Sequence, residues 1–156
     1  MSHRAGIYVS HNAEIAHRLM NLPGKCEHIH GHSLQIEMHI AGHIDEKGLL
    51  AGLDFGSVKK VFRTLIDEQL DHQLHLNYKD PWSRELINDH QYDPMKEVPA
   101  ISWSTLPGLR TWPGDPTTEN IAKWICEAMC DKFGAKFPIR IFVQETNTNG
   151  AEYQLP

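Results

Sequence analysis

The chain has 156 residues, which is enough for one domain with a real hydrophobic core. Its formal net charge of −5 argues against a nucleic-acid-binding surface, which is normally basic, but leaves small anionic substrates possible. Three cysteines argue against a disulfide framework, and no apolar run approaches the roughly 20 residues of a membrane span, so we expect a reduced, cytoplasmic protein without membrane or nucleic-acid partners.

Two segments near the N-terminus predict a pair of β-strands. Residues 7–16 are rich in β-branched apolar side chains, and residues 33–41 alternate apolar with polar side chains. The intervening residues 21–25, Asn-Leu-Pro-Gly-Lys, have turn chemistry. We therefore expect these strands to pair antiparallel.

Two later segments have the apolar spacing of amphipathic helices. The first runs from residue 58 to about residue 70, behind Asp54 or Ser57 as a candidate N-cap. The second follows Thr117 or Thr118 and carries an apolar stripe, near which Cys126 and Cys130 are expected to be core thiols. Residues 137–143 and 151–155 predict two further strands.

This order of elements, ββααββ, predicts an α+β fold: a four-stranded antiparallel sheet with two helices on one face. Residues 78–115 are rich in Pro, Trp and Asp without clear periodicity, and a loop of that length is usually functional, interfacial or mobile. We expect one domain over residues 1–156, with this segment as a long insertion. Its tryptophans, Trp82, Trp103 and Trp112, would form a lid or an extra subunit contact.

The most informative motif is the string Lys-Cys-Glu-His-Ile-His-Gly-His at residues 25–32. His30 and His32 are two residues apart at a predicted strand, so they point to the same face and can converge on one metal ion. His17 from a neighbouring strand would complete the set. Three neutral imidazoles with one open position are typical of catalytic zinc. The alternative is histidines with ordinary hydrogen bonds; His28 is a spare imidazole nearby.

A series of short motifs follows along most of the chain. They are Ala16-His17-Arg18-Leu19, Cys26-x-x-x-His30-Gly31-His32, Leu53-Asp54-Phe55, Leu70-Asp71-His72 with Leu76-Asn77, Pro116-Thr117-Thr118-Glu119-Asn120, and Gln144-Glu145-Thr146. In this order they resemble the 6-pyruvoyl-tetrahydropterin synthase family, and within it the 6-carboxytetrahydropterin synthase branch, which the spacing from Cys26 to His30 also resembles. The resemblance implies the tunnelling fold, with subunits joined into barrels, and a homohexamer with active sites where subunits meet.

The resemblance also implies a role for each matching residue. His17, His30 and His32 would bind Zn²⁺, which acts as a Lewis acid on the side-chain oxygens of the substrate. Cys26 would be the catalytic base, and Asp71 with His72 would form a proton relay. Glu145 would anchor the pterin ring through two parallel N–H donors. The residues expected to support that pocket are Thr117, Thr118, Glu119 and Thr146.

The implied function is that of a zinc-dependent lyase. It would convert 7,8-dihydroneopterin triphosphate into 6-carboxy-5,6,7,8-tetrahydropterin, acetaldehyde and triphosphate, for 7-deazapurine (queuosine-type) synthesis. The alternatives are a 6-pyruvoyltetrahydropterin synthase, an aldolase acting on dihydroneopterin, which Cys26 disfavours, and a non-catalytic zinc- or pterin-binding oligomer.

Two further points stay open in the sequence. The string from Asp71 to Asn77 is one residue longer than the family's common form, which either shifts Asn77 or makes His75 a rival for the relay; otherwise His75 is simply a surface residue. For the triphosphate, the sequence offers only positively charged candidates: Arg18, Lys25 and Arg110.

Overall fold

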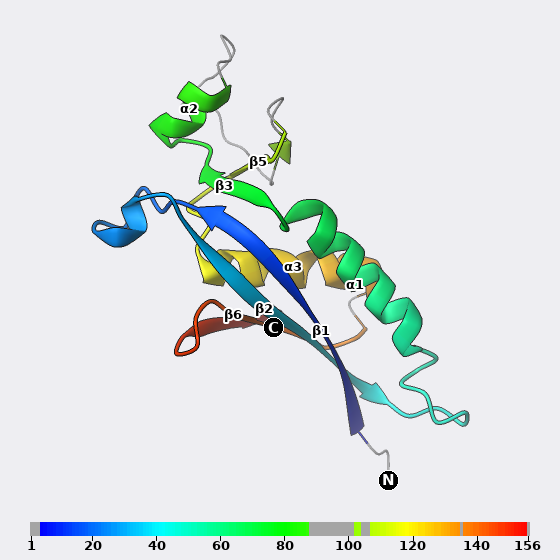
Figure 1. Cartoon of the computed structure of the whole chain (residues 1–156). Coiled ribbons are helices and arrows are strands. Elements are labelled where there is room, and N and C mark those ends of the chain that lie inside the picture. The colour runs from blue at the N-terminus through cyan, green and yellow to red at the C-terminus, as the bar shows by residue number, and fades with distance from the viewer. Residues whose placement is uncertain (1–3, 88–101, 104–106, 135, 156) are drawn as a thin grey trace.

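The computed structural model of the chain describes residues 4–87, 102–103, 107–134 and 136–155. In chain order the elements are β1 (Arg4–His17), the 3-10 turn η1 (Lys25–Glu27), β2 (His30–His43), α1 (Phe55–Gln69), β3 (Gln73–Asn77), α2 (Pro81–Ile87), β4 (Ser102–Trp103), β5 (Leu109–Trp112), α3 (Thr118–Phe133), β6 (Ile139–Gln144) and β7 (Gly150–Gln154). The seven strands form one sheet in the order β4-β5-β3-β1-β2-β6-β7 (Figure 1). None of the described helices is long and apolar enough to cross a membrane.

The centre of the sheet is the antiparallel pair β1 and β2, each of 14 residues. In its register Arg4 lies opposite His43, and His17 lies opposite His30. β6 and β7 continue the sheet antiparallel on the side of β2. These four strands confirm the four that the sequence predicts.

The other side of the sheet corrects the prediction of four antiparallel strands. β3 runs parallel to the last residues of β1, β5 runs parallel to β3, and β4 pairs antiparallel with β5. β4 and β5, together with α2, come from the segment that we expected to be a loop. The sequence pattern missed them because they are short, and because all four side chains of β5 are buried and therefore do not alternate.

The helices α1 and α3 pack on the same face of the sheet, as predicted. Side chains of one hydrophobic core come from alternate positions of β2 and from both helices; they include Leu34, Ile36, Met38, Ile40, Val58, Phe62, Ile66, Ile121, Ile125 and Met129. α2 stands apart from this core, beside β3 (Figure 1). The α+β class with two helices on one face is therefore confirmed, within a larger sheet.

The expected helix caps are present. Asp54 accepts a hydrogen bond from Ser57 N at 2.9 Å at the start of α1, and Thr117 accepts one from Asn120 N at 3.3 Å at the start of α3. Cys126 and Cys130 are buried in the core, and burial raises the pKa of the Cys126 thiol to about 11. These two thiols are therefore structural, as expected.

The tryptophans of the 78–115 segment do not share one role. Trp112 is buried in the core, so it is not part of a lid. Trp82 is 49% exposed at the start of α2. The Trp103 side chain lies outside what the structure describes.

Candidate functional site

Three histidines meet at one end of the sheet, where β1 ends and β2 begins. His17 and His30 are register partners, and His32 lies two residues further along β2. All three belong to the face that buries Ile15 and Leu34, because side chains two residues apart on a strand share a face. One ring nitrogen from each histidine lies within 4.8 Å of the other two, so the group could hold a metal ion.

Two backbone carbonyls orient these rings. His17 Nδ1 lies 2.9 Å from the carbonyl oxygen of Pro116, and His30 Nδ1 lies 2.7 Å from that of His28. A carbonyl can only accept, so each Nδ1 carries the proton and each neutral ring has a free lone pair on Nε2. These two Nε2 atoms face each other at 3.0 Å. Two lone pairs at this distance repel unless a cation or a proton lies between them, and this donor set fits a divalent metal such as Zn²⁺.

The electrostatics of His17 favour this neutral form. Burial lowers the pKa of His17, and the nearby His30 and His32 lower it further, against the opposing effect of the Pro116 hydrogen bond. A neutral imidazole is the form that binds metal.

Glu145 lies beside the imidazoles, directly after β6. Its Oε1 is 3.7 Å from His32 Nε2 and 4.0 Å from His17 Nε2. Thr118 Oγ1 donates to Oε1 at 2.6 Å, and Asn149 Nδ2 donates to Oε2 at 3.0 Å. Burial raises the pKa of Glu145, but these hydrogen bonds and the nearby histidines outweigh it and leave the pKa below its ordinary value. The carboxyl group is therefore ionised at neutral pH.

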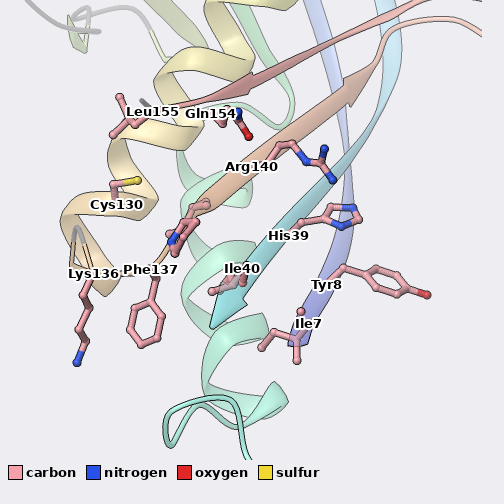
Figure 2. A pocket seen from close by; sticks show the side chains of 14 residues that line it. Ile7, Tyr8, His39, Ile40, Cys130, Lys136, Phe137, Arg140, Gln154 and Leu155 are labelled. Carbon is pink, nitrogen blue, oxygen red and sulfur yellow. The ribbon is translucent and has the colours of Figure 1, made fainter. Parts of the chain in front are cut away.

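A cavity of about 450 Å³ opens beside His32 and Glu145, and polar side chains that include Ser33, Gln144 and Thr146 line it. Its volume lies within the range of small-molecule sites. A larger cavity, of about 640 Å³, lies elsewhere on the sheet, around Tyr8, His39, Phe137 and Arg140 (Figure 2). None of the three clustered histidines lines that cavity, so the smaller cavity, beside His32 and Glu145, is the candidate substrate site.

The other residues predicted to bind substrate have different surroundings. Thr118 is buried and supports Glu145, whereas Thr117 caps α3. Glu119 is exposed in the first turn of α3. Thr146 lines the smaller cavity and accepts a hydrogen bond from Thr148 N at 3.2 Å.

Cys26 lies in the turn η1, four residues before His30, and is half-buried. Its carbonyl oxygen accepts a hydrogen bond from Leu19 N at 2.9 Å. Cys26 is not part of the metal-binding group found among the described residues, and neither is His28. The thiol is therefore available for a role other than metal binding.

Asp71 and His72 form a hydrogen-bonded pair between α1 and β3. His72 Nδ1 lies 2.7 Å from Asp71 Oδ2, and Asp71 Oδ1 accepts from Glu14 N at 2.8 Å. Burial raises the pKa of Asp71, but these hydrogen bonds outweigh it, so the pKa lies below its ordinary value. Glu14 precedes His17 by about 10 Å of strand, and the His72 side chain is 78% exposed. Glu14 also lies opposite the residue that follows His32 in β2, and the His72 ring is not among the imidazoles that could hold a metal ion.

His75 is neither a surface residue nor a rival for the relay. It is fully buried, His75 Nε2 lies 3.0 Å from the Leu70 carbonyl, and Trp112 Nε1 donates to His75 Nδ1 at 3.0 Å. Burial lowers the pKa of His75 to about 4. Both ring nitrogens are thus used within the core, which leaves none for catalysis.

Two of the three candidates for the triphosphate are also excluded. Arg18 forms an ion pair with the buried Asp80, and Arg110 is 1% exposed. Lys25 is exposed and keeps its place as a candidate.

Sequence reasoning missed two partners in the site. Asn149 holds Glu145, and the Asn-Gly pair at 149–150, a turn signal between two strands, could have drawn attention to it. The Pro116 carbonyl orients His17, and no residue type signals a backbone carbonyl in a sequence.

Comparison with known proteins relates this site to a family. The family model described as "6-pyruvoyl tetrahydropterin synthase" matches residues 6–156. A relative from Rickettsia bellii named 6-carboxy-5,6,7,8-tetrahydropterin synthase is 33% identical over 78 residues, which are 49% of this chain and 55% of the relative. A relative of the same name from a Synechocystis species is 28% identical over 153 residues, 96% of this chain and 93% of the relative. The chain thus spans about half the length of the Rickettsia relatives it matches.

Solved structures share the fold. An uncharacterized protein from Wolinella succinogenes superposes with a TM-score of 0.81 at 20% identity, covering 99% of this chain and all of the other. The 6-pyruvoyl tetrahydropterin synthase of Plasmodium falciparum superposes with a TM-score of 0.69 at 17% identity, covering 99% of each chain. With the family model matching nearly every residue, the chain belongs to the 6-pyruvoyl tetrahydropterin synthase family.

Proposed function

We propose that this protein is a zinc-dependent 6-carboxy-5,6,7,8-tetrahydropterin synthase. It converts 7,8-dihydroneopterin triphosphate and water into 6-carboxytetrahydropterin, acetaldehyde and triphosphate, and the product supplies 7-deazapurine (queuosine-type) synthesis. The observation that carries the proposal is the cluster of His17, His30 and His32 beside an ionised Glu145 at an open cavity. The names of the relatives support the carboxy-forming branch.

His17, His30 and His32 hold the metal ion in this proposal, through the ring nitrogens that face one another. A bound Zn²⁺ supplies a Lewis acid for the hydroxyl groups of the substrate side chain. Glu145 accepts two N–H donors from the edge of the pterin ring. Its oxygens already accept one hydrogen bond each, from Thr118 and Asn149, and each keeps lone pairs for a further donor.

Cys26 acts as the base that removes a carbon-bound proton of the substrate, from a turn next to the strand that carries His30. The Asp71 carboxylate accepts from His72 Nδ1, which leaves His72 Nε2 as the atom that exchanges protons. Because the His72 side chain is exposed and His72 is not one of the three histidines that could hold the metal ion, we assign this relay to the site of a neighbouring copy in a homohexamer.

The first test is product analysis. The zinc-loaded protein is incubated with 7,8-dihydroneopterin triphosphate, and the products are identified by mass spectrometry. Acetaldehyde with 6-carboxytetrahydropterin is the expected result, whereas 6-pyruvoyltetrahydropterin would assign the protein to the sister activity. Metal binding without turnover would overturn the enzymatic proposal and favour a binding role.

The second test concerns the base. Cys26→Ala should lower kcat by about 100-fold or more while zinc stoichiometry stays unchanged. Cys130→Ala, a matched removal of a buried thiol on α3, should leave kcat near its wild-type value. Undiminished turnover by the Cys26 variant would exclude this residue as the base.

A further inference from the structure

The turn that carries Cys26 is held by the two residues that follow His17. Leu19 N donates to the Cys26 carbonyl at 2.9 Å, and Arg18 Nε donates to the Glu27 carbonyl at 2.6 Å. The turn spans three residues and buries none of them. These hydrogen bonds, rather than core packing, therefore determine where the Cys26 thiol lies relative to the metal ligands.

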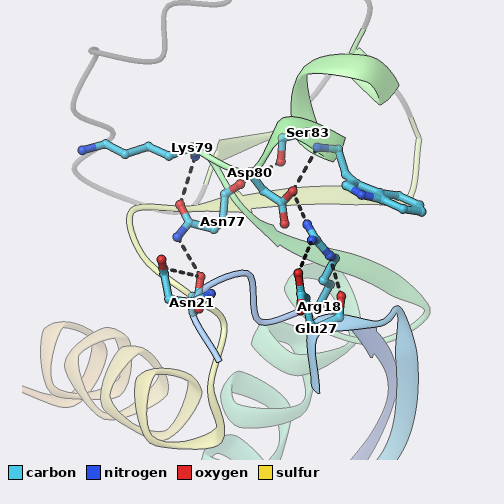
Figure 3. Close-up of polar contacts among 9 residues, drawn as sticks. Arg18, Asn21, Glu27, Asn77, Lys79, Asp80 and Ser83 are labelled. Atoms are coloured by element: carbon cyan, nitrogen blue, oxygen red, sulfur yellow. Dashed lines mark hydrogen bonds and ion pairs between the residues drawn. The ribbon is translucent and has the colours of Figure 1, made fainter. Parts of the chain in front are cut away.

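Arg18 is in turn oriented by the residues that follow β3. Its Nη1 donates to Asp80 Oδ1, and its guanidinium carbon lies 5.5 Å from the ring centre of Trp82 (Figure 3). Its Nη2 also lies 3.8 Å from Glu27 Oε1, on the Cys26 turn. One planar guanidinium group thus connects the turn to the start of α2.

Asp80 is a rigid anchor for this contact. Its side chain is fully buried, and Oδ1 also accepts a hydrogen bond from Trp82 N at 2.9 Å. Its backbone N donates to the Asn77 carbonyl at 3.0 Å, and its carbonyl accepts from Ser83 N at 2.9 Å. A buried carboxylate fixed at backbone and side chain can hold a guanidinium in one orientation.

We propose that Arg18 and Asp80 are positioning residues for Cys26, and that the start of the 78–115 segment braces the turn that carries this thiol. The inference rests on the proposed role of Cys26 as the base. It gives this segment a part in the site that its sequence did not reveal. It also gives a role to the ion pair between Arg18, the residue directly after His17, and the buried Asp80.

The free energy of unfolding shows whether the ion pair between Arg18 and Asp80 contributes to the structure. Removing Arg18 leaves the Asp80 carboxylate buried without its counter-charge, which costs more than removing both groups. The double variant Arg18→Met/Asp80→Asn should therefore be more stable to urea than Arg18→Met alone. The Cys26 turn should stay loosened in both variants, because both lack the guanidinium that binds Glu27.

The experiment measures the reactivity of Cys26 in the full chain. Iodoacetamide labelling is followed by mass spectrometry of the Cys26 peptide, with the buried Cys126 and Cys130 as internal reporters of folding. We expect Arg18→Met and Asp80→Asn to label Cys26 at least about threefold faster, because the half-buried thiol becomes more accessible. Arg18→Lys should fall between, since an ammonium group cannot bind the Glu27 carbonyl and Asp80 in a fork. Lys123→Met, which removes an exposed cation 4.0 Å from Glu127, should label as wild type does.

Kinetics give the second measurement. A misplaced base should lower kcat by about tenfold or more, with KM within about twofold and zinc stoichiometry unchanged. Wild-type labelling rates in both single variants would overturn the proposal, whatever their kcat. If the wild-type protein shows no turnover, the proposed function fails, but the Cys26 labelling rates of the variants still test whether Arg18 and Asp80 hold the turn. If a single variant labels Cys126 and Cys130 as fast as Cys26, that variant is unfolded, and the labelling rate of Arg18→Lys then provides the test.

Discussion

Two neighbouring regions of the sheet place buried histidines side by side and use them in opposite ways. His17, at the end of β1, is the register partner of His75 on β3, and both are fully buried. His17 uses one ring nitrogen for the Pro116 carbonyl and presents the other to His30. His75 uses both ring nitrogens in hydrogen bonds, to the Leu70 carbonyl and to the Trp112 indole. Burial therefore does not distinguish a candidate metal ligand from a structural histidine; the number of ring nitrogens that the core leaves without a hydrogen bond does.

The largest expected difference between the two regions is in the affinity for Zn²⁺. His30→Ala removes a proposed direct ligand and should weaken Zn²⁺ binding by more than about 100-fold, the upper end of what loss of a supporting hydrogen bond costs. His75→Gln, the matched change in the neighbouring region, should keep stoichiometric zinc. Competition with a chelator measures both affinities. Equal affinities in the two variants would remove the distinction between the regions.

Glu145 offers the next largest effect, on substrate rather than metal. Glu145→Gln keeps an oxygen for the Thr118 hydroxyl but loses the charge, so kcat/KM should fall by about 10- to 100-fold through weaker hydrogen bonds to the pterin. The control is Glu152→Gln, an exposed carboxylate on β7, which should leave kcat/KM unchanged. A wild-type kcat/KM for the Glu145 variant would exclude it as the anchor.

Acid should destabilise the protein through His75. Its pKa is lowered from an ordinary 6.5 to about 4, so the unfolded chain binds the proton first as pH falls. The contribution to the free energy of unfolding is fully present above pH 6.5 and is lost as pH falls toward 4, by on the order of 3 kcal/mol. Urea unfolding across this window measures it. His75→Gln should flatten the slope, and the exposed His43→Gln should not; equal slopes in all three proteins would refute the assignment.

The smallest expected effect concerns the hydrogen bond that Trp112 donates to His75. Trp112→Phe removes the indole N–H and leaves His75 Nδ1 buried without that donor. We expect a loss of about 1–3 kcal/mol in the free energy of unfolding, measured with urea, and unchanged zinc stoichiometry. Tyr8→Phe, which removes a polar group from an aromatic ring that is 62% exposed, is the control with little expected change. Lost zinc binding in the Trp112 variant would show that the two regions are not separable.

Much of the fold could be predicted because long elements carry strong patterns. β2 alternates over its length, and α1 and α3 have clear apolar faces behind Asp54 and Thr117 as caps. β3 and β5 were missed because elements of five and four residues give too little periodicity. Their parallel pairing joins segments distant in the chain, which local pattern does not contain.

The site, like the fold, could be predicted from the sequence only where the pattern is local. Strand periodicity and the spacing of His30 and His32 were enough to predict that two imidazoles share a face, because alternation of side chains is a local property of extended backbone. The sequence by itself also determined the family and the two core thiols. Only the tertiary structure decided that His75 is structural, that Arg18 binds Asp80, and that Asp71 binds both His72 and the backbone of Glu14. Each of these depends on which buried partner a polar group meets, and contacts across the fold set that partner.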